Sequence, residues 1–446
     1  MIEFGELMDS DVVRQILRGS LLSLLARLVA APVVAICLLT STWLVVGSLG
    51  SESYSMYALV IGVLVMLPFT DLGLGVAVMD VVARRQSGSR QIIATLKSSL
   101  KILCFASAVL LATAWLGRGF SVWSYLLAGA GADIDTEVAF ALSLFALGLP
   151  LSLGVRVLTG LELNHVTVGF QALTAVITVS LTAAAIALNG TLLSVSLVPF
   201  LSLVISNALA SLLAARKLGL LRLWRDTSLP IPTVSARQLF AVAGPMLVIT
   251  MILPFAYQSD RFIIAHVGTL DQVAQYALAY ALFGPLLGIA GSAASALWPA
   301  FIRHTTRDSV RKPLLLIAAL FFLGGCAVAL LYTLFGPFLA RVVGGGEVDT
   351  PQLLYFAFGS LLIVQCTMYP LSMFLTTPAD LRFQAALHVA MLVFNIPLSI
   401  LGAYAIGPAG PVFATSIAMF VALFLPKAAR ALYVTRNGLD TRLMHG

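Results

Sequence analysis

The stretch that decides the fold is LGSESYSMYAL at residues 49–59, because it recurs in the second half of the chain as VGTLDQVAQYAL at residues 267–278. Two shorter matches follow in the same order. Residues 131–136 recur as residues 345–350, and the pair Leu158-Thr159 recurs as Leu375-Thr376. Each match lies at the same point of its half, and a shared period of this kind indicates a duplicated architecture.

The composition around these stretches is that of a membrane protein. The 446 residues are 60% hydrophobic and only 10% charged, whereas soluble proteins carry about 25% charged residues. A span needs about 20 apolar residues, and it must be a helix because lipid offers no partner for a free backbone group. Apolar runs such as residues 361–375 lack the alternation of a barrel strand. We therefore predict an all-α membrane protein.

Twelve apolar segments are long enough to cross a bilayer, six in each half of the chain. Residues 12–18, ahead of the first, carry apolar side chains at helical spacing and are predicted to form either a short interfacial helix or a frayed tail. The expected spans lie near residues 21–46, 55–82, 95–117, 137–158, 166–188, 192–214, 239–266, 273–301, 313–336, 352–376, 384–406 and 410–433.

The connections between these spans alternate in charge. One set, together with both chain ends, carries nearly all the lysine and arginine, and the other carries only Arg118 and Arg341 among acidic residues. Positive loops stay in the cytoplasm, so both ends are predicted to be cytoplasmic. The net charge of +7 then reflects topology and anionic lipid rather than nucleic acid, and no nucleic-acid partner is expected.

An even number of spans per half gives both halves the same orientation in the membrane. We predict an N-terminal six-helix bundle at residues 1–217, a cytoplasmic linker at 218–234 and a C-terminal six-helix bundle at 235–446. Secondary transporters with parallel repeats bind substrate between the halves and expose it on alternate sides. Alternating access between two bundles is therefore the expected mechanism.

Several motifs resemble those of bacterial oligosaccharide flippases. Residues 49–59 resemble the signature that opens the second helix of that family, although Ser55 stands where the family usually has glycine. The further matches follow the family's order over essentially the whole chain: DLGLG at 71–75, ARR at 83–85, GP at 244–245, SDRFII at 259–264, YALA at 276–279 and WPAF at 298–301.

This resemblance implies the fold shared by polysaccharide exporters and by multidrug and toxin extruders. It implies a flippase of the bacterial inner membrane that moves a polyprenyl-diphosphate-linked oligosaccharide for O-antigen, capsule or exopolysaccharide synthesis. Membrane lipids, a polysaccharide polymerase and chain-length proteins are the expected partners. An ion-coupled antiporter for drugs or organic cations has the same fold and is the nearest alternative, and a membrane glycan polymerase or ligase is a third.

No catalytic or nucleotide-binding signature is present: the sequence has no P-loop and no HExxH or GxSxG motif. An enzyme is therefore not expected, nor is a cofactor, and the energy would come from coupling to H⁺ or Na⁺. The five histidines are scattered, so no metal site is expected. The four cysteines lie in apolar segments and are predicted to be small core side chains.

Ionisable residues inside spans are costly and are candidates for function. Arg27 and Arg261 are predicted to contact the anionic substrate, because the guanidinium fork matches phosphate oxygens. Asp260 and Asp71 are candidates for ion coupling. The alternatives are that Arg27 reaches the interface, that Asp260 and Arg261 form a structural pair, and that Asp71 pairs with Arg27.

Further cations lie at the predicted cytoplasmic mouth. Arg84 and Arg85 follow the second span, and Arg303 follows the eighth. They are predicted to collect anionic substrate, and the alternative is that they set orientation and contact lipid headgroups.

Overall fold

The computed structural model describes residues 11–66, 73–83, 89–127, 134–219, 236–295, 297, 301 and 311–437. Within these ranges the side chains of residues 11–25 and 236–250, and of a few others, are not described. The described chain is built from helices. This follows from the composition, since a helix satisfies its own backbone hydrogen bonds inside lipid.

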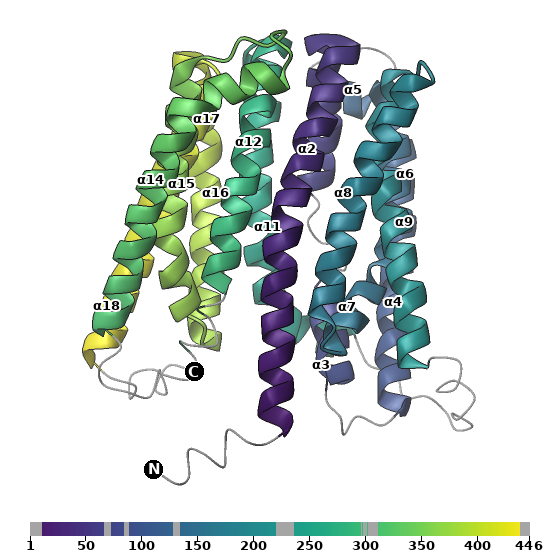
Figure 1. Cartoon of the computed structure of the whole chain (residues 1–446), viewed down its shortest axis with the longest axis vertical. Helices are drawn as coiled ribbons and strands as arrows, with labels where there is room; N and C mark the ends of the chain where they lie inside the picture. Colours follow the sequence, from purple (N-terminus) through teal and green to yellow (C-terminus); the bar gives the residue numbers. More distant parts are fainter. Residues whose placement is uncertain are drawn as a thin grey trace.

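The N-terminal half contains eight of the labelled helices (Figure 1). They are α2 (Asp11–Met66), α3 (Leu74–Ala83), α4 (Ser89–Gly119), α5 (Val122–Leu126), α6 (Ile134–Leu151), α7 (Leu153–Gly160), α8 (Asn164–Ala187) and α9 (Leu192–Leu218).

The C-terminal half begins at α11 and repeats the arrangement of long helices. Its elements are α11 (Ala236–Val267), α12 (Leu270–Ser295), α14 (Arg311–Val343), α15 (Gln352–Phe374), α16 (Pro378–Ile406), α17 (Ala409–Met419), the π-helix η1 (Phe420–Phe424) and α18 (Leu425–Asn437). The last three form one continuous rod.

Ten stretches of the described residues are long and apolar enough to cross a membrane. The first of them, Val29–Val63, runs through a break at Gly50 and so joins the first two predicted spans. The 32-residue helix α11 is not among the ten. With the first stretch divided at Gly50 and α11 added, the described helices correspond to the twelve predicted spans.

Two local features differ from the expected boundaries. Residues 12–18 belong to α2 and continue straight into the first span, so they form neither a separate interfacial helix nor a frayed tail. The fourth predicted span is divided into α6 and α7 after Pro150, because proline removes a backbone hydrogen bond and clashes with the preceding turn.

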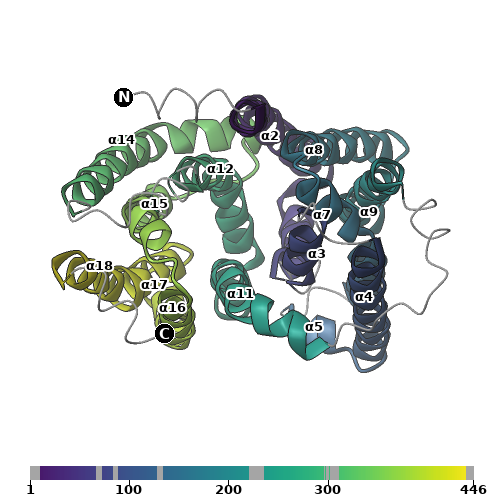
Figure 2. The same ribbon diagram turned by 90° about the horizontal axis from the view of Figure 1, so that it is seen from below.

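The helices form two groups that lie side by side (Figure 2). In the N-terminal half α2 packs on α8, and α6 packs on α4 and α9. In the C-terminal half α15 packs on α14 and α17, and α11 packs on α16. The halves meet where α2 contacts α11 and α12.

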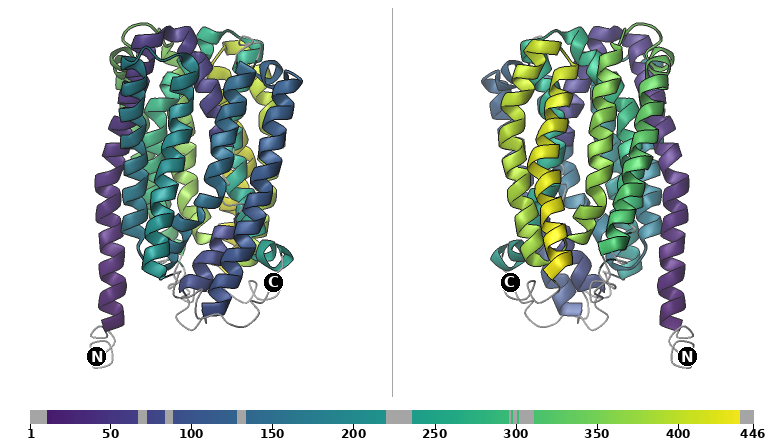
Figure 3. Two further views of the ribbon diagram at one scale, coloured as in Figure 1. Left: turned by 90° about the vertical axis from the view of Figure 1, so that its right-hand side faces the viewer. Right: turned by 90° about the vertical axis from the view of Figure 1, so that its left-hand side faces the viewer.

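The two ends of the bundle differ in charge. The beginning of α2 and the end of α18 lie at the same end (Figures 1 and 3), here called the basal end, and α5 lies at the opposite, distal end. The distal ends of the described helices carry Arg118 and Arg341 among acidic residues. The basal ends carry Arg90, Lys97, Arg216, Lys217, Arg311, Lys312, Arg382 and Arg430.

The repeated stretch of sequence marks the same turn in both halves. Gly50 has a φ of 81°, a left-handed conformation that favours glycine, and there α2 turns from the first span into the second. In the second copy, Thr269 and Gln272 cap the start of α12 reciprocally, each side chain bonding the backbone N–H of the other at 3.3 Å. This capping box begins the eighth span beside the end of the seventh.

Candidate functional site

Asp260 is buried in the distal half of α11, with 1% of its surface exposed. Three hydroxyl groups surround its carboxylate. Oδ1 lies 3.1 Å from Ser399 Oγ of α16, and Oδ2 lies 3.2 Å from Thr415 Oγ1 of α17 and 3.4 Å from Tyr276 Oη of α12. The carboxylate therefore joins four helices of the C-terminal half.

Asn395 adds a further oxygen to this group. Its Oδ1 lies 3.4 Å from Ser399 Oγ, one turn along the same helix, and 3.0 Å from Thr415 Oγ1. Asn395, Ser399 and Thr415 are fully buried. We call Asp260, Asn395, Ser399 and Thr415 the oxygen cluster.

The hydroxyls of Ser399 and Thr415 each lie between Asp260 and Asn395. Ser399 and Thr415 each carry one hydroxyl proton, yet each lies within hydrogen-bonding distance of both the Asp260 carboxylate and Asn395 Oδ1. The proton of Tyr276 is directed at the carbonyl of Tyr257, 2.9 Å away. With the hydroxyl protons of Ser399 and Thr415 directed at the carboxylate, an Asn395 amide turned to place Nδ2, which has no other hydrogen-bond partner, toward the two hydroxyls completes these contacts. A bound cation, or a proton on Asp260, would neutralise the buried carboxylate.

Arg261, the next residue, contacts the other half of the molecule. Its Nη1 donates to the carbonyl of Ala58 in α2 at 3.0 Å. Its Cζ lies 4.9 Å from the ring centroid of Tyr280 and 5.9 Å from that of Tyr276, within the range of cation–π attraction. Arg261 is 6% exposed, and its Nε has no hydrogen-bond partner.

Two further hydrogen bonds join the halves near the distal end. Ser55 of α2 donates from Oγ to the carbonyl of Leu270 at 2.6 Å, so the two copies of the repeated stretch touch each other. His266 Nε2 lies 3.0 Å from the carbonyl oxygen of Tyr125 in α5. We call these two contacts and the Arg261–Ala58 bond the distal contact.

Gln258 lies beside the distal contact, one turn before Arg261. It is fully buried, and neither atom of its amide group has a hydrogen-bond partner. A Cβ built on Gly62 of α2 would lie 3.6 Å from its Oε1 and 3.8 Å from Arg261 Cδ. Buried amide groups normally have hydrogen-bond partners, so the amide of Gln258 leaves an unpaired donor and acceptor beside α2.

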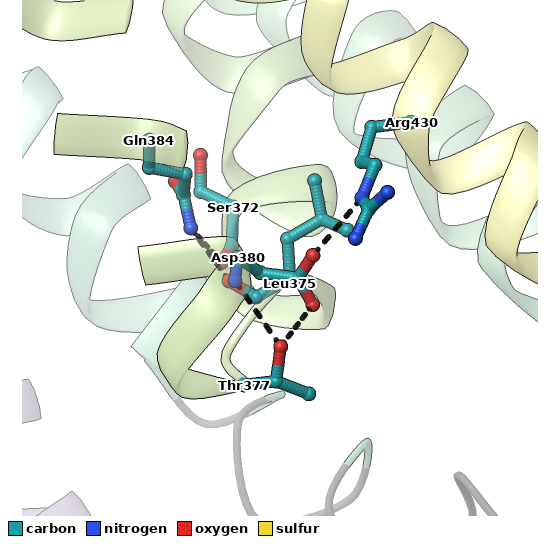
Figure 4. A network of polar contacts seen from close by, with 6 residues as sticks. All are labelled: Ser372, Leu375, Thr377, Asp380, Gln384 and Arg430. Carbon is teal, nitrogen blue, oxygen red and sulfur yellow. Dashed lines mark hydrogen bonds and ion pairs between the residues drawn. The ribbon is translucent and has the colours of Figure 1, made fainter. Parts of the chain in front are cut away.

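A second polar cluster ties together the basal end of the C-terminal half (Figure 4). Asp380 is fully buried and accepts from Arg430 Nε at 3.2 Å and from Thr377 Oγ1 at 2.6 Å. Gln384 Nε2 donates to the carbonyl of Leu375 at 2.6 Å, where α15 ends. These contacts fix the start of α16 against α15 and α18, and we assign them a structural role.

The predicted site residues are not gathered in one place. Arg27 is exposed on the basal part of α2, about 20 Å along the bundle from the level of Arg261 at about 1.5 Å per helical residue. Asp71, Arg84, Arg85 and Arg303 lie outside the described residues. Their roles stay predictions.

Asp260 and Arg261 were predicted from the sequence as candidate site residues, whereas the partners of Asp260 were not. Asn395 is a polar residue in the middle of an apolar span, and this position could have identified it from the sequence as a candidate site residue. Ser399 and Thr415 carry no comparable signal, because single hydroxyl residues are common in membrane helices.

The chain belongs to the family whose model is described as polysaccharide biosynthesis protein, which matches residues 16–305. Its fold is similar to that of a multidrug resistance transporter of the MATE family and MOP superfamily in an inward-facing conformation. That likeness has a TM-score of 0.66 and 17% identity and covers 93% of this chain and 99% of the other.

Two further solved structures share the fold. The lipid II flippase MurJ, in an inward closed conformation, has a TM-score of 0.63 and 13% identity over 91% of this chain and 90% of its own. The MATE transporter VcmN of Vibrio cholerae, in a bent form, has a TM-score of 0.53 and 18% identity over 91% of this chain and 99% of its own. No curated protein sequence matches at a significant level. The chain is thus a multi-pass membrane protein with a MATE-like fold.

Proposed function

We propose that this member of the polysaccharide biosynthesis protein family moves a polyprenyl-diphosphate-linked oligosaccharide across the bacterial inner membrane, by alternating access of its two halves driven by a monovalent cation. The observation that carries the proposal is the buried carboxylate of Asp260 in the oxygen cluster, next to the distal contact between the halves. The basal end would be cytoplasmic because it holds most of the basic residues.

The oxygen cluster suits a monovalent cation. Oxygen donors are the ligands of hard cations, and one carboxylate balances one positive charge. Asp260, Asn395, Ser399 and Thr415 would hold Na⁺, or Asp260 would take up a proton. In both cases the buried negative charge, which is costly without a partner, is neutralised.

The cation would act on the halves through α11. Asp260 and Arg261 are consecutive residues, so their side chains leave the helix about 100° apart. Asp260 faces α16 and α17, and Arg261 faces α2. Tyr276 lies within reach of both. A change of charge at Asp260 would therefore shift the helix that holds the distal contact.

The cargo is inferred from the family and from the arginine side chains. The oxygens of a diphosphate are bound well by two parallel N–H donors, and the guanidinium group of arginine supplies such a pair. Arg261 has an unpartnered Nε in the interface between the halves, and it would exchange the Ala58 carbonyl for phosphate oxygens as the halves separate. Arg27, Arg84, Arg85 and Arg303 would attract the substrate at the cytoplasmic mouth.

The two halves would move as units. We propose residues 1–217 and 235–446 as these units; α9 ends at Leu218 and α11 begins at Ala236. Asp71 is proposed as a second ion-coupling group. A polysaccharide polymerase and chain-length proteins would take over the exported product.

Transfer of a lipid-linked oligosaccharide across proteoliposomes tests the cargo. The purified protein should move the lipid-linked glycan, and Arg261→Ala should impair transfer while the protein still inserts. Arg118→Ala is the matched control, because Arg118 lies at the same end and its polar and cation–π contacts among the described residues are with Thr136 and Trp115 of its own half. Absence of transfer by the wild-type protein would contradict the proposal.

A drug or organic-cation antiporter is the second candidate. The similarity to an inward-facing MATE transporter, at a TM-score of 0.66, favours it. A site for cationic drugs needs acidic groups, whereas Arg261 is the charged side chain that bonds across the contact between the halves, and Asp260 faces α16 and α17 instead. Robust efflux of drug cations from the same proteoliposomes, without glycan transfer, would replace the first candidate by the second.

A further inference from the structure

Gln258 and Arg261 lie on one face of α11, because residues three positions apart are neighbours on a helix surface. Both reach the same point of the other half. A Cβ built on Gly62 of α2 would lie 3.6 Å from Gln258 Oε1 and 3.8 Å from Arg261 Cδ. Since glycine has no side chain, α2 covers the two polar side chains closely. We call Gln258 and Arg261 the covered pair.

Among the described residues the covered pair lacks several hydrogen-bond partners. Gln258 is fully buried, and neither Oε1 nor Nε2 is bonded. The hydroxyl of Tyr280 lies close to this amide, but one hydroxyl serves only one of the two amide atoms. Arg261 donates from Nη1 to the carbonyl of Ala58, and its Nε is unpaired. Unpaired buried polar atoms are costly, which indicates a role other than packing.

Alternating access would give these atoms a partner. When the halves separate at the distal end, α2 moves away from α11 and uncovers both side chains. The amide of Gln258 then offers a donor and an acceptor side by side, and the guanidinium group of Arg261, one helical turn away, offers a pair of parallel N–H donors. The matching ligand carries a phosphate next to two adjacent groups that can donate and accept hydrogen bonds.

We propose that Gln258 binds the sugar ring attached directly to the diphosphate of the cargo, while Arg261 binds the phosphate. This rests on the proposed function. The hydroxyls at C2 and C3 of such a ring are adjacent, so one donates to Oε1 while the other accepts from Nε2. The phosphate is attached at C1, beside C2, so a single ring reaches from Gln258 to Arg261. Gln258 thus recognises the saccharide, and Arg261 recognises the charge.

A purely structural role for Gln258 makes a different prediction for stability. If its amide held the halves together, removing the amide would lower the melting temperature. Replacing an unpaired buried amide by an apolar side chain of similar length is instead neutral or stabilising. Gln258→Met should therefore melt at the wild-type temperature or above it, and a lower melting temperature would contradict a role in binding alone.

The test compares the affinities of glucose 1-phosphate and cyclohexyl phosphate for the purified protein, measured by calorimetry. Both ligands carry a phosphate on a ring of the same size, and only the first has ring hydroxyls. Both need the same separation of α2 from α11, so the cost of that separation cancels in the ratio of the two dissociation constants. The wild type should prefer glucose 1-phosphate, and Gln258→Met should lower this preference about tenfold, as expected for two hydrogen bonds.

Gln365→Met is the matched control. Gln365 is buried and its Oε1 is also unpaired, but it lies on α15, outside the contact between α2 and α11. This variant should keep the wild-type preference.

The proposal is overturned if Gln258→Met keeps the wild-type preference, or if the wild type binds both ligands equally or binds neither. Equal binding together with glycan transfer in proteoliposomes would leave the proposed function standing. Conversely, a protein that shows the Gln258-dependent preference but transfers no lipid-linked glycan would contradict the proposed function and leave the sugar site standing.

Discussion

The substitution Asp260→Asn removes the only carboxylate of the oxygen cluster and keeps its shape. The amide retains one oxygen and places an NH₂ group near Ser399, Thr415 or Tyr276, whose hydroxyl oxygens can accept from it. The fold should therefore persist, since a neutral amide costs less to bury than an unpaired carboxylate. What is lost is the charge that balances the cation.

The size of the loss follows from electrostatics. A cation about 4 Å from the carboxylate gains about 4 kcal/mol at an effective dielectric constant of about 20. Because about 1.4 kcal/mol corresponds to a factor of ten, the variant should bind the cation about a thousandfold more weakly. At physiological ion concentrations its site would be empty.

Two measurements report this loss. The first is the dependence of transport in proteoliposomes on an imposed Na⁺ or H⁺ gradient. The second is thermal unfolding in detergent against Na⁺ concentration, with choline as the reference cation, because a ligand that binds only the folded state stabilises it. Wild-type protein should respond to one cation in the transport assay, and Asp260→Asn should not.

Asp271→Asn is the matched control, because Asp271 is exposed and bonded only to Gln275 within its own helix. It should behave like the wild type. If Asp260→Asn retained the wild-type half-saturating cation concentration, the oxygen cluster would not be the coupling site.

Three further substitutions test other contacts. Arg261→Ala should lower glycan transfer at least about tenfold while the amount of protein in the membrane stays normal. Arg261→Lys should restore transfer only in part, since lysine lacks the planar guanidinium group. Equal transfer by the wild type and Arg261→Ala would show that this residue does not contact the substrate. Ser55→Ala deletes the hydrogen bond to Leu270, and the loss of about 1 kcal/mol should shift the equilibrium about fivefold toward separation of the halves at the distal end, measured as the distance between spin labels at Leu188→Cys and Glu347→Cys after the native cysteines are replaced by alanine. An unchanged distance distribution would show that this bond does not stabilise the distal contact. Arg430→Ala leaves the buried carboxylate of Asp380 without its ion pair and should lower the free energy of unfolding by about 2 kcal/mol. An unchanged melting temperature would show that the polar cluster around Asp380 is not structural.

Much of the fold could be predicted from sequence because lipid imposes a strong constraint. Apolar length indicates the spans, and the stretches 49–59 and 267–278, which repeat each other in sequence, lie against each other in the structure; the direction of the spans stays a prediction from loop charge. The internal details depend on weaker local effects. Gly50 turns α2 within one helical assignment, and the π-helix at Phe420–Phe424 interrupts the last span; neither is visible in hydropathy.

The site could be predicted only in part. Asp260 and Arg261 were identified because charges are rare inside spans. The cluster itself joins residues 139 and 155 positions apart, and hydropathy does not determine which helices are neighbours. Likewise, Ser55 departs from the glycine usual in the family, and the structure gives its hydroxyl a partner in the other half.

We propose that a cation at Asp260 drives movement of a lipid-linked oligosaccharide between the halves. Glycan transfer in proteoliposomes, measured with and without a transmembrane Na⁺ or H⁺ gradient, tests it most directly. One gradient should accelerate transfer by the wild-type protein and have no effect on Asp260→Asn. Transfer at the same rate with and without either gradient, or an equal response in both proteins, would contradict it.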